Sequence, residues 1–166
     1  TWGIGLGCNG LIDVLVEPLD ESWRAPLDSL AAGTPVTVLT VIESTIPDVP
    51  VGARSYAGES GPPQAVATRD PVPDTVVNGV ESTVSMVHGQ ENAVTVEVET
   101  ERGTATVLVD GLEPVPTLLL VGSQPDIHPV ARVGSDAGFE VSVHSSRGAR
   151  GPDAFPNADS VETGHP

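Results

Sequence analysis

The sequence TLLLVGSQPDIHPVARVGSDAGFEVSV, residues Thr117 to Val143, decides the fold of the second half of this chain. Thr117 to Val121 is an apolar run typical of a buried strand. The pattern from Asp126 to Ala137 predicts a helix, which Gly138 closes, and Phe139 to Val143 alternates like a second strand. Strand, helix and strand in this order predict a parallel pair with a right-handed crossover, the opening of a Rossmann-like sheet.

The loop between the first strand and the helix carries only part of a dinucleotide-binding fingerprint. Gly122 stands at the first glycine of G-x-G-x-x-G, while Gln124 and Ile127 occupy the second and third places. Asp126 adds negative charge where a helix N-terminus would attract an anion. The second strand ends near Ser145 without the carboxylate that binds a ribose. Standard NAD(P) binding is therefore not expected, and a structural Rossmann half-sheet is favoured.

The first half of the chain is predicted to be rich in strands. Its expected helix, Ser22 to Ala32, has Asp20 or Ser22 as N-cap and Gly33 just past its end. Alternation and β-branched runs predict the strands, with a turn at Glu101-Arg102-Gly103 between the last two. The expected strands are Leu11–Leu19, Val36–Ile42, Ala53–Ala57, Ala65–Thr68, Thr83–His88, Ala93–Thr100 and Thr104–Val109, the last three forming an antiparallel meander.

These patterns predict an α/β protein of two parts. Residues 1–112 form a β-rich domain, and residues 113–166 form a partial Rossmann-like βαβ domain. Pro114 and Pro116 mark a linker of about ten residues between them. Because an open half-sheet leaves strand edges that need a cover, we expect a homo-oligomer.

The composition limits the cellular environments and the classes of binding partner that can be expected. The formal net charge is −16, Arg supplies all seven basic residues, and Lys is absent. Such a balance argues against nucleic acid and anionic membranes as partners, and it is typical of halophilic, archaeal-type proteins in which concentrated cations screen acidic groups. The single Cys8 excludes an internal disulfide, and no leader or long apolar run is apparent. We therefore expect a cytoplasmic protein.

The only thiol lies in a glycine loop, Gly5-Leu6-Gly7-Cys8-Asn9-Gly10. Glycines on both sides leave the sulfur and the backbone N–H groups accessible to a ligand. Cys8 is thus a candidate nucleophile, soft metal ligand or sulfur carrier, or a small residue packed in a tight turn.

Other polar residues carry weaker signals. The four histidines, His88, His128, His144 and His165, lack the spacing of a metal site. Ser145 and Ser146 beside His144 have no surrounding nucleophile elbow, so a hydrolase is not supported. Glu97, Glu99 and Glu101 follow a period of two and predict a solvated acidic face.

Two segments resemble the XdhC/CoxI family, the accessory proteins of molybdenum hydroxylases such as xanthine dehydrogenase and carbon monoxide dehydrogenase. Gly5 to Leu19 is similar to that family's GLGCGG-x-I-x-V-x-I-E-P-L stretch, and Pro116 to Pro166 looks like the start of its C-terminal Rossmann domain. The second similarity is carried by Leu118–Gly122, Ala137–Val143, Arg147, Phe155–Asp159 and Gly164–Pro166.

The resemblance implies a protein that binds the molybdenum cofactor, assists its sulfuration and delivers it to the apo-enzyme. Partners would be molybdenum hydroxylase subunits and a sulfur-donating desulfurase. The resemblance also implies which residues bind the cofactor. These candidates are Gly5, Gly7, Cys8, Asn9 and Gly10 in the first loop and Gly122 and Ser123 in the second, with Cys8 as the functional thiol.

The sequence departs from the family at several points. Asn9 stands where a glycine is usual, Gln124 and Ile127 replace a glycine and an alanine, and Ser145 replaces the acid that ends the next strand. The family also has segments before the first loop and after the last segment here. Two alternatives therefore stay open: a nucleotide-dependent oxidoreductase, and a degenerate Rossmann-type interaction module without a ligand.

Overall fold

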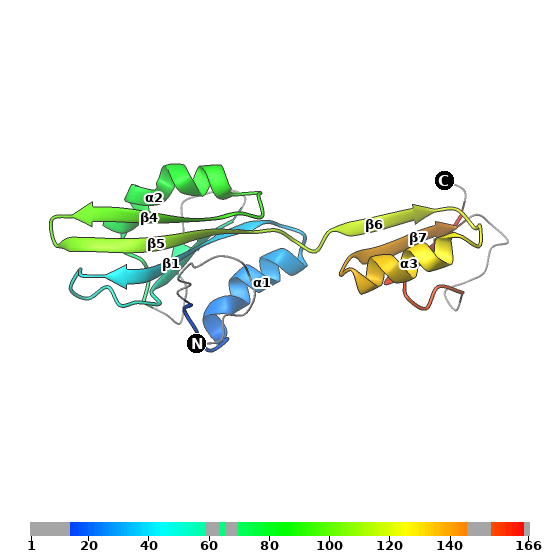
Figure 1. The fold of residues 1–166 in the computed structure, drawn as a ribbon, viewed down its shortest axis with the longest axis horizontal. Helices are drawn as coiled ribbons and strands as arrows, with labels where there is room; N and C mark the ends of the chain where they lie inside the picture. The colour runs from blue at the N-terminus through cyan, green and yellow to red at the C-terminus, as the bar shows by residue number, and fades with distance from the viewer. Residues whose placement is uncertain (1–13, 59–63, 66–69, 146–153, 165–166) are drawn as a thin grey trace, which may run out of the picture.

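The computed structural model describes residues 14–58, 64–65, 70–145 and 154–164, and it builds them into two sheets (Figure 1). The first sheet has five antiparallel strands in the order β3-β2-β1-β5-β4, and the second has three parallel strands in the order β6-β7-β8. The elements are η1 Glu21–Trp23, α1 Arg24–Ala31, β1 Val36–Ser44, β2 Arg54–Ala57, β3 Gln64–Ala65, α2 Asp74–Val87, β4 Ala93–Thr100, β5 Gly103–Leu112, β6 Thr117–Val121, α3 Ile127–Asp136, β7 Glu140–Ser145 and β8 Ser160–Thr163. This mixture confirms the predicted α/β class.

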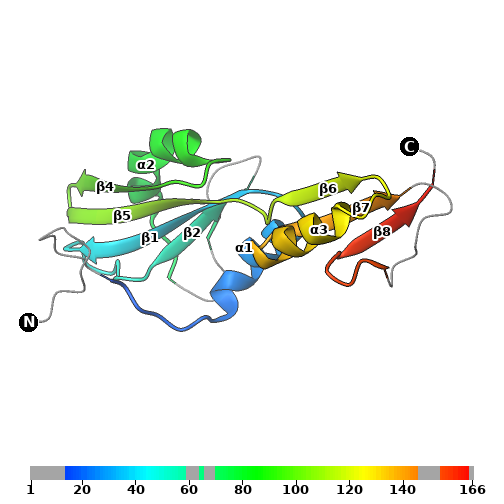
Figure 2. The same cartoon turned by 45° about the vertical axis from the view of Figure 1, so that its right-hand side comes forward.

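The centre of the five-stranded sheet is β1, whose residues Val36 to Val41 are all buried. Leu39 and Val41 pack under α2, while Val36 and Val38 alternate with them onto the opposite face, where η1 and α1 lie (Figures 1 and 2). The β-branched run predicted a strand covered on both faces, and that prediction is confirmed.

The prediction of a strand at Thr83–His88 is wrong, because this segment forms the end of α2. The valines that α2 buries are spaced three and four residues apart over most of its length, which matches a helix and not a strand. They are Val76, Val77, Val80, Val84 and Val87. The meander therefore contains only the β4–β5 hairpin, with Glu101 and Arg102 as its two-residue turn.

The strand predicted at Leu11–Leu19 is also not found in its described part. Residues 14–20 have no regular secondary structure, and Val14, Val16 and Leu19 are largely exposed. Alternation of apolar residues is typical of a strand, but no strand in the described part of the chain pairs with residues 14–20. The helix that follows is confirmed: Asp20 caps η1 by accepting a hydrogen bond from the Ser22 N–H, and Gly33 takes φ +80° just past the end of α1.

The strand, helix and strand predicted from Thr117 to Val143 are confirmed, with β6 and β7 parallel. The connection from Leu112 to Thr117 is shorter than the predicted ten residues, because β5 continues to Leu112. A third parallel strand, β8, was missed. Asp159 fixes its start, since its N–H donates to the Val141 carbonyl and its carboxylate accepts from the Val141 N–H.

The two sheets have separate cores. One side of the parallel sheet packs against α3 through Leu118, Leu120, Val141 and Val143, with Phe155 completing the cluster. The division into domains at 112 and 113 stays a prediction, although β5 ends at Leu112. None of the helices in the described part of the chain has the length and apolar character of a membrane span.

Candidate functional site

The first predicted site lies outside the described residues. Gly5, Gly7, Cys8, Asn9 and Gly10 all fall in residues 1–13, so their roles stay predictions. What the structure describes is the segment that follows from Val14 onward. Its conformation depends on a contact with the five-stranded sheet.

That contact is made by Arg54 of β2, whose side chain is fully buried. Its guanidinium donates to the Glu17 carboxylate and, over 3.0 Å, to the Ser22 hydroxyl. The ring of Trp23 lies 4.3 Å from the same guanidinium, within cation–π range. Sequence reasoning singled out none of these roles. The chain just after the Cys8 loop is therefore tied to β2 through a buried charge.

The second predicted site is the Gly122 loop, between β6 and α3. Gly122 takes φ +142°, a conformation that favours glycine, and its N–H donates to the His144 carbonyl, which extends the β6–β7 ladder by one bond. A Cβ at this position would lie 3.0 Å from Cδ1 of Ile127. The Ile127 side chain thus fills space beside the loop that a small third residue of the fingerprint would leave open.

The helix N-terminus behind this loop does not fit a phosphate. The Ile127 N–H is used by the Gln124 carbonyl at 3.2 Å, and Pro129, two residues later, has no N–H to offer. Asp126 occupies the N-cap position and is exposed, so its charge opposes an anion there. This geometry weighs against a pyrophosphate at the Gly122 loop, and equally against the phosphate of a pterin cofactor. Gly122 and exposed Ser123 remain predicted ligand contacts only.

At the ribose position the structure places a buried hydroxyl. Ser145 ends β7, is fully buried on the same side of the sheet as Val141 and Val143, and its Oγ has no hydrogen-bond partner among the described residues. A serine can hydrogen-bond a sugar hydroxyl but brings no charge. The carboxylate that normally selects a ribose is absent from the end of β7.

The described histidines lie in three different environments. His88 follows α2 and its Nδ1 lies 3.1 Å from the Thr37 hydroxyl, whereas His144 of β7 lies 3.6 Å from the Glu162 carboxylate. His128 stacks on Phe155. Within residues 14–58, 64–65, 70–145 and 154–164, no three His, Cys, Asp or Glu side chains gather in a way that could hold a metal ion. His165 lies outside these ranges.

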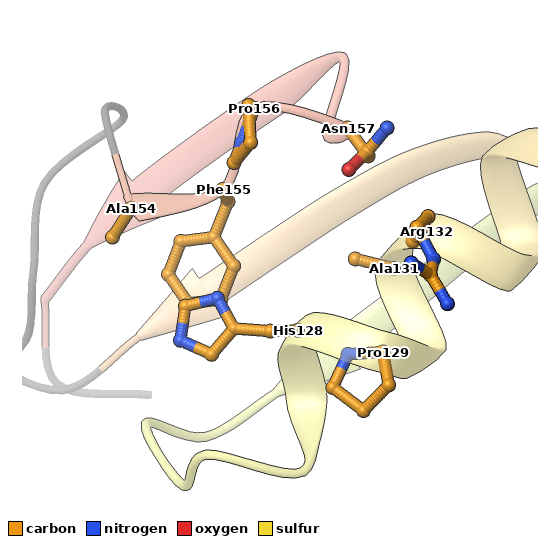
Figure 3. A pocket seen from close by; sticks show the side chains of 8 residues that line it. All are labelled: His128, Pro129, Ala131, Arg132, Ala154, Phe155, Pro156 and Asn157. Atoms are coloured by element: carbon orange, nitrogen blue, oxygen red, sulfur yellow. The ribbon is translucent and has the colours of Figure 1, made fainter.

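A pocket that the sequence did not indicate lies beside α3 (Figure 3). One wall comes from the helix and the other from residues 154–157, between β7 and β8. The available sequence signal was the spacing of His128 and Arg132, which places both on one face of a helix. That spacing alone is too common to predict a pocket.

Comparisons with known proteins give one relative by sequence. No family model matches the chain. The chain is 30% identical over 171 residues to a protein of Bacillus subtilis (strain 168) that is named as a probable subunit of xanthine dehydrogenase. The alignment takes in all of this chain and 45% of the relative, so the chain spans less than half of the relative's length. A crystal structure of a xanthine dehydrogenase from Bacillus halodurans aligns with 87% of this chain and 68% of its own, at 14% identity and a TM-score of 0.43.

Proposed function

We propose that this chain is part of an accessory factor for a molybdenum hydroxylase of the xanthine dehydrogenase type. The observation that carries the proposal is the alignment of the entire chain with a relative named as part of a xanthine dehydrogenase. The similarity of Gly5–Leu19 to a motif of hydroxylase accessory proteins supports the same assignment independently of that name.

In the finer form of this proposal, the factor binds the molybdenum cofactor, assists its sulfuration and delivers it to the hydroxylase, with a desulfurase as sulfur donor. The cofactor would supply the metal and the dithiolene that the mature hydroxylase needs. Cys8 is the proposed functional thiol, because a thiolate can carry sulfur or bind a soft metal. The N-terminus of α3 does not fit the cofactor's phosphate, so the proposal assigns it no step.

One experiment tests the accessory role and the binding of the cofactor separately. The chain, co-expressed with hydroxylase subunits under anaerobic conditions, should co-purify with them and carry molybdenum and pterin, measured by elemental analysis and by fluorescence of the oxidised pterin. Cys8→Ala should lose at least about tenfold in affinity for the cofactor, which corresponds to roughly 1.4 kcal/mol of binding free energy, and should therefore carry less molybdenum. Ser85→Ala, at an exposed position of α2 outside both glycine loops, is the control, and we expect it to keep its molybdenum.

The results distinguish the alternatives. Equal molybdenum in wild type and Cys8→Ala would remove the thiol from the mechanism. A stable complex with the hydroxylase but no cofactor would favour the second candidate, an interaction module without ligand. The N-terminus of α3, which does not fit a phosphate, also supports this candidate. If the chain forms no complex with the hydroxylase and also carries no cofactor, the proposal is overturned.

A further inference from the structure

The pocket beside α3 combines features that point to a ligand. It has a volume of about 420 Å³ and lies between α3 and residues 154–157. Figure 3 shows His128 and Phe155 on one side of the pocket and Asn157 across from them, with Ala131 between. Its described lining includes neither Gly122 nor Ser123, and the inference below does not rest on the proposed function.

Arg132 is the cation of this pocket, and its pairing differs from that of the other described arginines. Arg24 pairs with Glu21, Arg54 with Glu17 and Arg102 with Asp48. Arg132 has no carboxylate within 4.0 Å among the described residues. In a chain with 23 acidic and seven basic side chains, an arginine that pairs with no described carboxylate is available to an external anion.

The aromatic wall of the pocket is already ordered. The rings of His128 and Phe155 stack with centroids 4.5 Å apart and an angle of 8° between their planes. Phe155 is only 4% exposed and belongs to the core of the parallel sheet, which holds the pair in place. Because Phe155 is nearly buried, the flat surface for another planar group is that of the His128 ring stacked on it, and the Asn157 amide adds a hydrogen-bonding group across the pocket.

We propose that this pocket binds a small planar organic anion, with an aromatic ring against the His128–Phe155 pair and a carboxylate on Arg132. The ring and the charge must act together, because an exposed arginine alone gives little affinity in water. The recognition needs no rearrangement of the backbone, since α3 and the Phe155 core hold both parts of the site.

Three probes of related shape test the proposal: benzoate carries ring and charge, acetate carries the charge alone, and benzamide carries the ring alone. The readout is the imidazole Cε1–H resonance of His128, assigned by its loss in His128→Gln and followed at constant ionic strength. We expect a saturable shift with benzoate at millimolar concentration. Acetate and benzamide should each bind at least tenfold more weakly.

Variants at exposed arginines complete the test. Arg132→Gln removes the charge without removing a packed side chain, and should weaken benzoate at least tenfold and make it resemble benzamide. Arg102→Gln, at an exposed arginine of the β4–β5 turn, is the matched control and should bind benzoate like wild type. Equal binding of benzoate and acetate, or unchanged benzoate binding in Arg132→Gln, would overturn the proposal.

Discussion

Arg54 of β2 and Glu17 form an ion pair that joins two segments 37 residues apart, and the Arg54 side chain is only 1% exposed. A buried charge is stable only when it is paired and hydrogen-bonded. Here Ser22 and the Trp23 ring surround the same guanidinium. The described part of the irregular segment after the Cys8 loop, residues 14–20, therefore contacts the sheet through the Arg54 side chain and forms no strand ladder.

Breaking this pair should cost stability. Arg54→Met keeps most of the apolar stem but removes the cation that pairs with Glu17, so we expect the free energy of unfolding to fall by about 3–5 kcal/mol. Arg102→Met is the control, because its pair with Asp48 is exposed and worth roughly 0–1 kcal/mol. Urea denaturation measures both. A loss at Arg54 no larger than that at Arg102 would mean that the segment is held by other contacts.

Gly111 of β5 should tolerate no side chain. A Cβ there would collide with the Gln90 carbonyl oxygen and lie 2.6 Å from that of Val87, and backbone atoms cannot move aside as side chains do. We expect Gly111→Ala to lower the free energy of unfolding by about 3 kcal/mol or more, at the upper end of overpacking costs. Gly58→Ala, where a Cβ meets nothing within 4 Å, is the matched control. Equal stabilities of the two variants would contradict this close approach.

The sequence was most informative where a regular pattern of apolar residues extends along a whole helix or strand. Val36 to Val41 predicted a strand covered on both faces, and the βαβ unit followed from its order of patterns. The segment Thr83–His88 was wrongly predicted to be a strand, because the spacing of Val84 and Val87 indicates a helix only together with the earlier valines of α2. The strand β8 is four residues long, and the contacts that fix it come from β7. Short elements carry too little local signal to be predicted alone.

The candidate sites were less predictable than the fold. Motif spacing located the Gly122 loop. That the helix after this loop does not fit a phosphate depends also on Pro129, which lacks an N–H, and this effect can be recognised only once the start of α3 is known. Arg54 looked like an ordinary strand residue, since its partner Glu17 is distant in sequence. The pocket of His128, Phe155 and Arg132 likewise joins two segments that only the tertiary structure brings together.

Asp110 of β5 should make stability fall as the pH rises. Burial raises the pKa of this carboxyl above its ordinary value. The folded state then holds a proton that the unfolded state has already released, so Asp110 contributes most at low pH and this contribution is lost as the pH rises through the raised pKa. Asp110→Asn cannot ionise. Urea midpoints between pH 3 and 7 should show wild type losing stability relative to Asp110→Asn as the pH increases, and a constant difference would contradict the assignment.

The separate cores predict that the two sheets lose structure independently. Phe155→Ala should remove about 3–5 kcal/mol from the parallel sheet, because it empties a buried aromatic site in a small cluster. Native-state hydrogen exchange should show faster exchange at Val141 and Val143, with little change at Val107 and Val109 of β5. Val107→Ala is the converse control. Equal acceleration in both sheets would show that the boundary after Leu112 does not separate two cooperative units.

The uncovered side of the parallel sheet leads to a last prediction, on self-association. Leu119 and Val121 are 60% and 62% exposed on the side away from α3, and strands of parallel sheets are normally covered on both faces. We therefore expect a homodimer through this face. Light scattering in molar salt should give twice the chain mass for wild type and the single mass for Leu119→Glu, whose charge would be buried at the interface. Val133→Glu, at an equally exposed position on α3, should remain dimeric. A wild-type monomer, or a Leu119→Glu dimer, would mean that something other than a second copy covers these strands.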